Sequence, residues 1–222
     1  MPDTKISALC ALICVCVTND VLPIVDATAC GTTKKITVTN LATPIKGTDV
    51  VTGTQEIWIP AGAWSVDPTA CTGADISTSL VTDKYITTIN FDTCTSEDAQ
   101  FLWHPPLNWD YCTVQFQVLW TNTGGAACQT IDFDLAGVAL TDDDAIGSAT
   151  FGTAQNTTDT FTAQNDINKS ALSSAITIGS TPTSGDSILF KLSRDTVADN
   201  LAGDCKIIGV NLRVSITKGT AT

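Results

Sequence analysis

The chain has 222 residues, of which only 15% are charged, and its formal net charge is -12. Its eleven basic residues are scattered along the sequence. Nucleic acids bind to surfaces with clustered Lys and Arg, so the scattered basic residues and the negative net charge argue against a nucleic acid as the partner. They argue against an anionic membrane surface for the same reason.

The composition also indicates the fold class. Threonine and serine are abundant, methionine occurs once, and no long stretch has helical periodicity. Threonine suits pleated, half-exposed surfaces better than helices. We therefore expect an all-β fold with an N-terminal β-hairpin or extended arm over residues 1–41. A linker over 42–55 and an antiparallel jelly-roll sandwich of roughly eight strands over 56–222 would follow it.

The N-terminal arm begins with an apolar run and continues into a predicted hairpin. Residues 6–17 follow Lys5 as a secretion signal would, but Asp3 offsets that charge and no clean cleavage site follows. At about 12 residues the run is too short to span a bilayer. Val21–Val25 and residues 36–39 are predicted to pair as short strands. Such a hairpin is marginal alone and needs its own domain or other copies as a packing partner.

The larger domain is organised around residues 101–120, where two aromatic-rich runs flank His104-Pro105-Pro106. Tandem prolines cannot donate ladder hydrogen bonds, so they mark a strand end. In the second run the alternation places Val114, Phe116 and Val118 on one buried face. Further strands are predicted over 56–60, 82–92, 99–103, 127–140, 187–192 and 206–217, and a short helix is considered over 165–173. The residues expected to face inward in the later strands are Ile131, Phe133, Leu135, Ile208, Val210, Leu212, Val214 and Ile216.

Three stretches near the N-terminus occur in a fixed order: ISAL at 6–9, DVLPIVD at 20–26 and TKKITV at 33–38. Together they resemble a leader found on many tailed-bacteriophage virion proteins. The resemblance implies a virion location and a short trimeric tail fibre or appendage, docked to tail, collar or capsid proteins by its N-terminal arm. The anchoring or interface residues of such a homotrimer would be Ile6, Leu9, Val21, Leu22, Ile24, Ile36 and Val38. The chain departs from the leader by carrying Cys10, Cys14 and Cys16 in the spacer.

The remainder of the chain also carries familiar stretches, among them WIPA at 58–61, KLSRD at 191–195 and DNLAGD at 199–204. They resemble an uncharacterised domain that recurs in phage structural proteins. That resemblance implies a virion location and a trimeric jelly roll, and it implies no ligand.

The nine cysteines are irregularly spaced and include no CxxC pair, so a zinc site is not expected. Several stand in strand-like runs, where cysteine behaves as a small buried hydrophobe. We expect mostly free thiols. A disulfide framework in a secreted protein is the alternative.

The candidate catalytic residues have simpler explanations. His104 is the only histidine and no GxSxG nucleophile elbow is present, so a Ser-His-Asp triad is not supported. Asp132 and Asp134 alternate onto a solvent face instead of facing each other across a cleft. The run 142–144, three aspartates, lacks the EF-hand pattern and is interpreted as a solvated turn, with a bound cation as the open alternative. No catalytic residue, metal or cofactor is predicted.

Two further groups of residues have both a structural and a functional interpretation. Trp103, Trp109 and Tyr111 are interpreted as core or subunit-interface anchors, and a sugar-stacking platform is the alternative. Arg194, beside Asp195 and near Asp199, is interpreted as a structural ion pair or a turn cap.

The sequence therefore predicts a structural component of a phage particle, most simply a short trimeric fibre that contacts host surface glycan through exposed loops. A capsid decoration or cement protein is the nearest alternative. A secreted carbohydrate-binding module is the alternative from another functional class.

Overall fold

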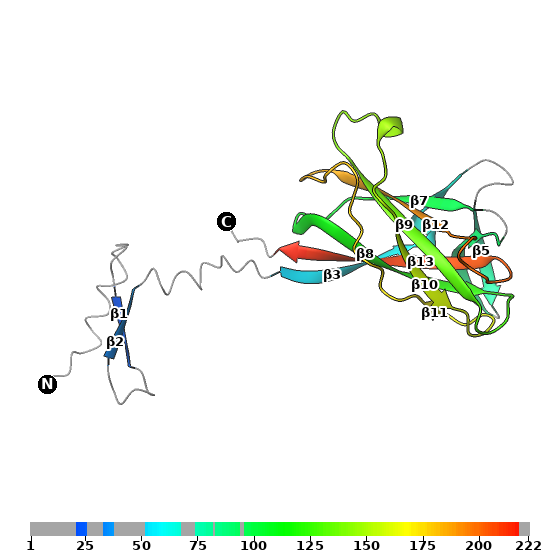
Figure 1. Ribbon diagram of the computed structural model, residues 1–222, viewed down its shortest axis with the longest axis horizontal. Helices are drawn as coiled ribbons and strands as arrows, with labels where there is room; N and C mark the ends of the chain where they lie inside the picture. Colours follow the sequence, from blue (N-terminus) through cyan, green and yellow to red (C-terminus); the bar gives the residue numbers. More distant parts are fainter. Residues whose placement is uncertain are drawn as a thin grey trace. The chain divides into compact units, whose positions relative to one another are not determined.

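The computed structural model describes residues 21–25, 33–37, 52–67, 74–81, 83–93 and 96–217. Contacts divide the chain into two units, Met1–Val51 and Thr52–Thr222. In the first unit β1 (Val21–Val25) pairs antiparallel with β2 (Thr33–Thr37), as Figure 1 shows. The predicted hairpin is confirmed, although β2 begins at Thr33 and not at Ile36. Of the predicted anchors, Val21, Leu22, Ile24 and Ile36 lie in this hairpin, whereas Ile6, Leu9 and Val38 lie outside the described residues.

The second unit is an antiparallel sandwich of jelly-roll type, built from two sheets (Figure 1). The five-stranded sheet has the order β10-β9-β12-β7-β4, and the six-stranded sheet has the order β11-β8-β13-β6-β5 with β3 also paired to β13. The strands of the first sheet are β4 (Ser65–Val66), β7 (Asp98–Trp103), β9 (Thr130–Leu140), β10 (Gln155–Thr160) and β12 (Ser187–Arg194). Those of the second are β3 (Thr52–Pro60), β5 (Asp75–Val81), β6 (Lys84–Phe91), β8 (Trp109–Asn122), β11 (Asn168–Lys169) and β13 (Cys205–Thr217).

The predicted all-β class is confirmed, and three details of the prediction are corrected. β3 starts at Thr52, so the end of the predicted linker belongs to the sheet, where it pairs with the end of β13. The short polar strands β5 and β10 raise the number of strands above eight, because their Ser and Thr residues gave no apolar alternation. The helix considered over 165–173 is absent. Within the described residues no helix is long and apolar enough to cross a membrane.

The aromatic corner joins the two sheets. β7 ends at Trp103 in one sheet and β8 begins at Trp109 in the other, so His104-Pro105-Pro106 carries the chain across the sandwich. The ring centroids of Trp103 and Trp109 lie 5.2 Å apart. Val114, Phe116 and Val118 are fully buried on the inner face of β8, as their alternation predicts. The corner is thus part of one hydrophobic core that both sheets share.

β13 is paired along both of its edges and contains a bulge. β8 lies on one side, while β6 and then β3 lie on the other. The register against β8 shifts between Ile207 and Gly209, which inserts one extra residue into β13. Ile207 and Val210 therefore both face the core, and Ile208 is only half-buried. The prediction that Ile208 faces inward is wrong, because a bulge reverses the alternation beyond it.

The outer edge of β8 is closed by an extended segment in which Ser170 and Ser173 lie three residues apart. The backbone N–H groups of Val118 and Phe116 donate to the hydroxyls of Ser170 (2.9 Å) and Ser173 (3.0 Å). In turn, the backbone N–H of Ser170 donates to the carbonyl of Val118, and that of Ser173 donates to the carbonyl of Phe116. Ile176 then exchanges two backbone bonds with Val114. Serine hydroxyls thus satisfy donors in β8 that an added strand would otherwise use.

A fully buried arginine joins the end of β6 to the connection between β12 and β13. Arg194 donates Nε to Asp199 Oδ2 at 2.6 Å and Nη2 to Asp199 Oδ1 at 3.1 Å. Its remaining bonds go to the backbone carbonyls of Phe91, Asp92, Leu201 and Gly203. The carboxylate of Asp195 accepts from the backbone N–H groups of Val197 and Ala198. The predicted ion pair and turn cap are therefore both present.

We predict that Arg194→Met lowers the free energy of unfolding by about 3–5 kcal/mol, since it leaves the buried Asp199 carboxylate without its counter-charge. The matched control is Arg213→Met, which removes a half-exposed ion pair to Glu56 and is expected to cost about 1 kcal/mol or less. Urea denaturation of both variants measures the difference. Equal losses of unfolding free energy for the two variants would contradict the larger contribution assigned to the buried Arg194–Asp199 pair.

Candidate binding face on the six-stranded sheet

An exposed tryptophan lies on the outer face of the six-stranded sheet. In β3, Ile57 and Ile59 pack against the core, so alternation turns Glu56 and Trp58 outward. Trp58 is 44% exposed although it is one of the largest apolar side chains of the domain. Single exposed apolar side chains are common on protein surfaces, so the surroundings of Trp58 decide whether it belongs to a site.

The ring of Trp58 lies over a glycine of the neighbouring strand. A Cβ atom added to Gly209 would lie 2.6 Å from both Cζ2 and Cη2 of the indole. Gly209 directly follows the bulge in β13, and β3 and β13 are paired beside it. The bulge and the missing side chain together give the indole room to lie across the strand. The six-membered ring of the indole is thereby held close to the backbone of β13.

Next to Trp58, a carboxylate ties two outward-facing polar side chains of β13. Glu56 Oε2 accepts from Asn211 Nδ2 at 2.8 Å, and Glu56 Oε1 accepts from Arg213 Nη2 at 2.6 Å. These hydrogen bonds, that from Arg213 first, lower the pKa of Glu56, and the positive charges of Arg213 and Lys169 act in the same direction. Glu56 and Arg213 therefore form an ion pair on the outer face of the sheet, in which the two charges neutralise each other.

β8 adds two oriented amides to the same face. Gln115 lies opposite Arg213, and Gln117 lies opposite Asn211, which is itself opposite Trp58. Gln115 Nε2 donates to the carbonyl of Ser173 at 2.8 Å, and Gln117 Nε2 donates to that of Ser170 at 3.1 Å. Because a carbonyl only accepts, these bonds fix which end of each carboxamide is nitrogen.

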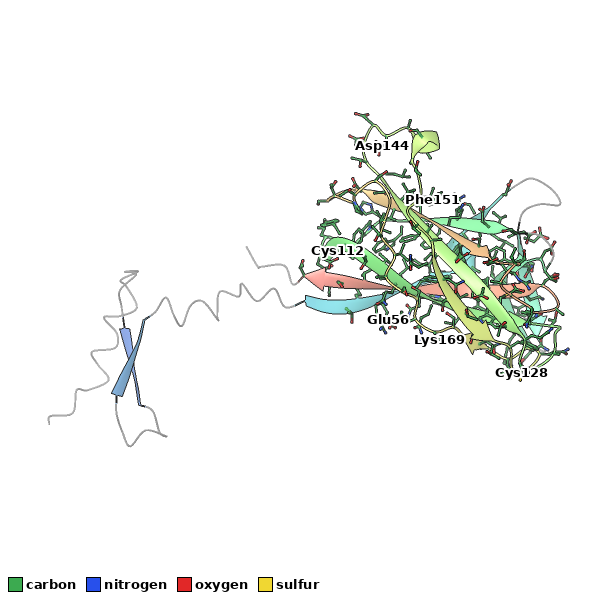
Figure 2. All side chains as sticks on the ribbon, in the orientation of Figure 1. Glu56, Cys112, Cys128, Asp144, Phe151 and Lys169 are labelled. Atoms are coloured by element: carbon green, nitrogen blue, oxygen red, sulfur yellow. The ribbon has the colours of Figure 1, made fainter. Side chains whose placement is uncertain are left out.

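We call this set of residues the Trp58 face; its members are Glu56, Trp58, Gln115, Gln117, Asn211 and Arg213. Figure 2 labels Glu56 on β3 and Lys169 on the edge strand β11, beyond β8 in the strand order. The face combines one fixed aromatic ring with hydrogen-bonding groups from three adjacent strands, whose spacing is about 4.8 Å. It holds no cluster suited to acid–base chemistry, and among the described residues no group of three or more His, Cys, Asp or Glu side chains is placed to hold a metal.

The tryptophans considered as a sugar platform lie elsewhere and are covered. Trp103 is 6% exposed and Trp109 is 1% exposed, and Tyr111 packs against Trp109 with ring centroids 5.3 Å apart. A covered ring has no face to offer a sugar, so Trp103 and Trp109 act as the core anchors that the sequence analysis favoured. Tyr111 is half-buried at a positive φ of 57°, in an irregular part of β8.

The acidic candidates are bound to neighbouring side chains on the five-stranded sheet. Asp132 is buried and accepts from the hydroxyl of Thr158, while Asp134 accepts from Asn156 Nδ2 at 3.4 Å. Burial raises the pKa of Asp134, and the hydrogen bond from Asn156 opposes this effect. They share one sheet surface, as the alternation predicts, although Asp132 is covered and not solvated.

The other candidates remain isolated. His104 Nδ1 lies 3.3 Å from the hydroxyl of Ser187 at an exposed position. Asp144 lies in the loop that protrudes between β9 and β10 (Figure 2), where its carboxylate accepts from the backbone N–H of Thr141. Cys112, Cys128 and Cys205 are free thiols. The remaining cysteines, Cys10, Cys14, Cys16, Cys30, Cys71 and Cys94, lie outside the described residues.

The sequence analysis missed the Trp58 face, although one signal was present. Ile57-Trp58-Ile59 alternates, so a strand that buries its two isoleucines must expose the tryptophan between them. The role of Gly209 had no such signal, because it depends on a bulge.

Among solved structures, this chain has matches of low similarity. The chain matches no protein-family model and no curated protein. A carbohydrate-binding module specific for non-crystalline cellulose is 10% identical over 67% of this chain and 85% of that chain, with a TM-score of 0.41. A Caldicellulosiruptor saccharolyticus module solved with mannohexaose is 10% identical over 75% and 99%, with a TM-score of 0.34. A Shewanella oneidensis protein of unknown function is 11% identical over 86% and 99%, with a TM-score of 0.30. TM-scores of this size carry no argument about the ligand of this chain.

We predict that Ser170→Ala and Ser173→Ala each lower the free energy of unfolding by about 1–3 kcal/mol, since each leaves a buried N–H of β8 without an acceptor. Ser174→Ala, at an exposed neighbouring position, is the control and is expected to change stability by about 0.5 kcal/mol or less. Chemical denaturation measures all three. A loss at Ser170 and Ser173 no larger than that of the control would contradict the role assigned to their hydroxyls.

Proposed function

We propose that the second unit binds carbohydrate through the Trp58 face. The observation that carries this proposal is the 44% exposed indole of Trp58, which lies over Gly209 beside a row of oriented polar side chains. The C–H groups of a pyranose form a flat apolar surface that stacks on an aromatic ring, and its hydroxyls lie at the ring edge. Asn211, Gln115 and Gln117 supply amides at that edge, and amides both donate to and accept from hydroxyls.

The proposed role is binding and not glycosidic cleavage. Most glycoside hydrolases use two carboxyl groups that flank the scissile bond. On the Trp58 face, Glu56 is already committed to Asn211 and Arg213. Asp132 and Asp134 belong to the other sheet, where their carboxylates accept hydrogen bonds from Thr158 and Asn156 respectively.

We predict that Trp58→Ala weakens binding to a retained polysaccharide by about tenfold or more, because a central aromatic anchor typically contributes about 2 kcal/mol. The measurement is affinity electrophoresis of the full chain in gels that contain hydroxyethyl cellulose, galactomannan, arabinoxylan or dextran. Tyr85→Ala is the matched control: Tyr85 is 77% exposed on β6, outside the Trp58 face.

Two results would contradict this proposal. One is that none of the polysaccharides retards the wild-type chain. The other is that a polysaccharide retards Trp58→Ala as strongly as it retards the wild type.

We further propose that the chain is a phage virion protein, most simply a trimeric fibre or appendage, in which the first unit is the anchoring arm. Two observations support this: the ISAL, DVLPIVD and TKKITV stretches, and the formation of a separate unit by residues 1–51. A two-stranded hairpin such as β1–β2 is marginally stable without a partner. Copies of the arm in a trimer, or another virion protein, would supply that partner. Binding of host surface glycan by the second unit fits such an appendage.

We predict that light scattering of the purified full chain gives three times the 23.2 kDa mass of one chain. Leu22→Asp in the hairpin is expected to shift the mass towards one chain, because a charge in a shared apolar surface is not compensated. The matched control is Lys35→Asp in β2, a position that is charged in the wild type. A monomeric wild-type chain would contradict the trimer.

A further inference from the structure

We infer that the Trp58 face selects neutral, hydroxyl-rich glycans and rejects carboxylated, sulfated or phosphorylated ones. This inference rests on the proposed carbohydrate-binding function and specifies its ligand class. It follows from which atoms of the face donate, which accept and where the charges lie.

The only cationic member of the face is already paired. Arg213 Nη2 donates to Glu56 at 2.6 Å, and this bond is the first cause of the lowered pKa of Glu56. A ligand carboxylate would have to compete with a carboxylate that is held in place and stays ionised at neutral pH. A surface built to bind anions leaves its arginine forks open to the ligand. Here Glu56 neutralises the arginine before a ligand arrives.

The amides of the face are oriented with their nitrogen atoms engaged. Gln115 Nε2 and Gln117 Nε2 donate to the carbonyls of Ser173 and Ser170, and Asn211 Nδ2 donates to Glu56. Each carboxamide then keeps its oxygen and one N–H for a ligand. A hydroxyl group can both donate to such an amide and accept from it. The three amides therefore match a hydroxyl-rich ligand, and they bring no positive charge for an anion.

The charge of the rest of the chain reinforces this preference. The formal net charge of -12 disfavours approach of a polyanion at moderate ionic strength. Lys169, exposed on β11, is the nearby positive charge that acts on Glu56, and its effect is the smallest of the causes that shift that carboxyl. It lies on an edge strand, separated from β13 by β8.

The test compares pairs of polysaccharides that share a backbone and differ in charge. Affinity electrophoresis of the full chain is run with hydroxyethyl cellulose against carboxymethyl cellulose, and with highly methyl-esterified pectin against polygalacturonate. The wild type is expected to be retarded more strongly by the neutral member of any pair that it binds. Retention by the neutral polymer is expected to be insensitive to salt between about 0.05 and 0.5 M, since no net charge is matched across the interface.

Glu56→Gln tests the origin of the selectivity. Glutamine keeps one acceptor oxygen where the carboxylate has two, and it removes the neutralising charge, so the guanidinium of Arg213 becomes available to a ligand carboxylate. A hydrogen bond to a charged group is worth about 1.5–3 kcal/mol, so the affinity for carboxymethyl cellulose or polygalacturonate should rise by about tenfold or more relative to the neutral partner. Lys169→Gln is the control, and it should leave the preference for the neutral polymer unchanged.

The outcomes separate this inference from the function on which it rests. If the wild type binds the anionic member of a pair more tightly, glycan binding stands and the inference is overturned. An unchanged preference in Glu56→Gln would also overturn it, because Glu56 would not be the source of the selectivity. If no neutral or anionic polysaccharide retards the wild type, the proposed function itself fails.

Discussion

The bulge in β13 is the constraint on which the rest of the domain's outer surface depends. β13 is the strand that joins β8 on one side to β3 and β6 on the other, so its register sets the positions of all three. One extra residue between Ile207 and Gly209 reverses which residues face the core. Below the sheet this brings Ile207, Val210 and Leu212 into the interior. On the outer face of the sheet, it places Gly209 next to the ring of Trp58.

Buried and half-buried polar groups support the six-stranded sheet at two places. Beyond β8, the serine segment satisfies backbone donors with hydroxyl groups, and its carbonyls hold the amides of Gln115 and Gln117. The same segment therefore closes a sheet edge and orients two residues of the Trp58 face. At the other end of the domain, Arg194 ties the end of β6 to the β12–β13 connection. Of these two supports, only the serine segment contacts the Trp58 face directly, through Gln115 and Gln117.

Much of the fold could be predicted from local patterns, because a strand in one of two packed sheets alternates between side chains that face the core and side chains that face outward. Val114, Phe116 and Val118 in β8, and Ile131, Phe133 and Leu135 in β9, are buried as their spacing predicts. The proline pair at 105–106 marks the crossing between sheets for the same local reason. Prediction failed where the pattern depended on a partner. The bulge in β13, the serine pairing along β8 and the polar strands β5 and β10 are all set by neighbouring strands.

The candidate site was less predictable than the fold. The clustering of Trp103, Trp109 and Tyr111 in the sequence favours core or interface anchors, with a sugar platform as the alternative, and Trp103 and Trp109 are indeed buried. Trp58 stands alone in the sequence, and its partners Gly209, Asn211 and Arg213 lie about 150 residues further along the chain, a separation typical of the non-local contacts of β-sandwiches. Only the paired strands β3 and β13 bring them together.

The most direct test of the account is an NMR titration of the tryptophan indole N–H signals with an oligosaccharide prepared from a polysaccharide that retards the chain. The chain has five tryptophans, and Trp64, Trp103, Trp109 and Trp120 are all buried. We predict that the Trp58 signal shifts with increasing ligand while the other four stay in place. A shift confined to any of the buried four, with Trp58 unchanged, would contradict binding at this face.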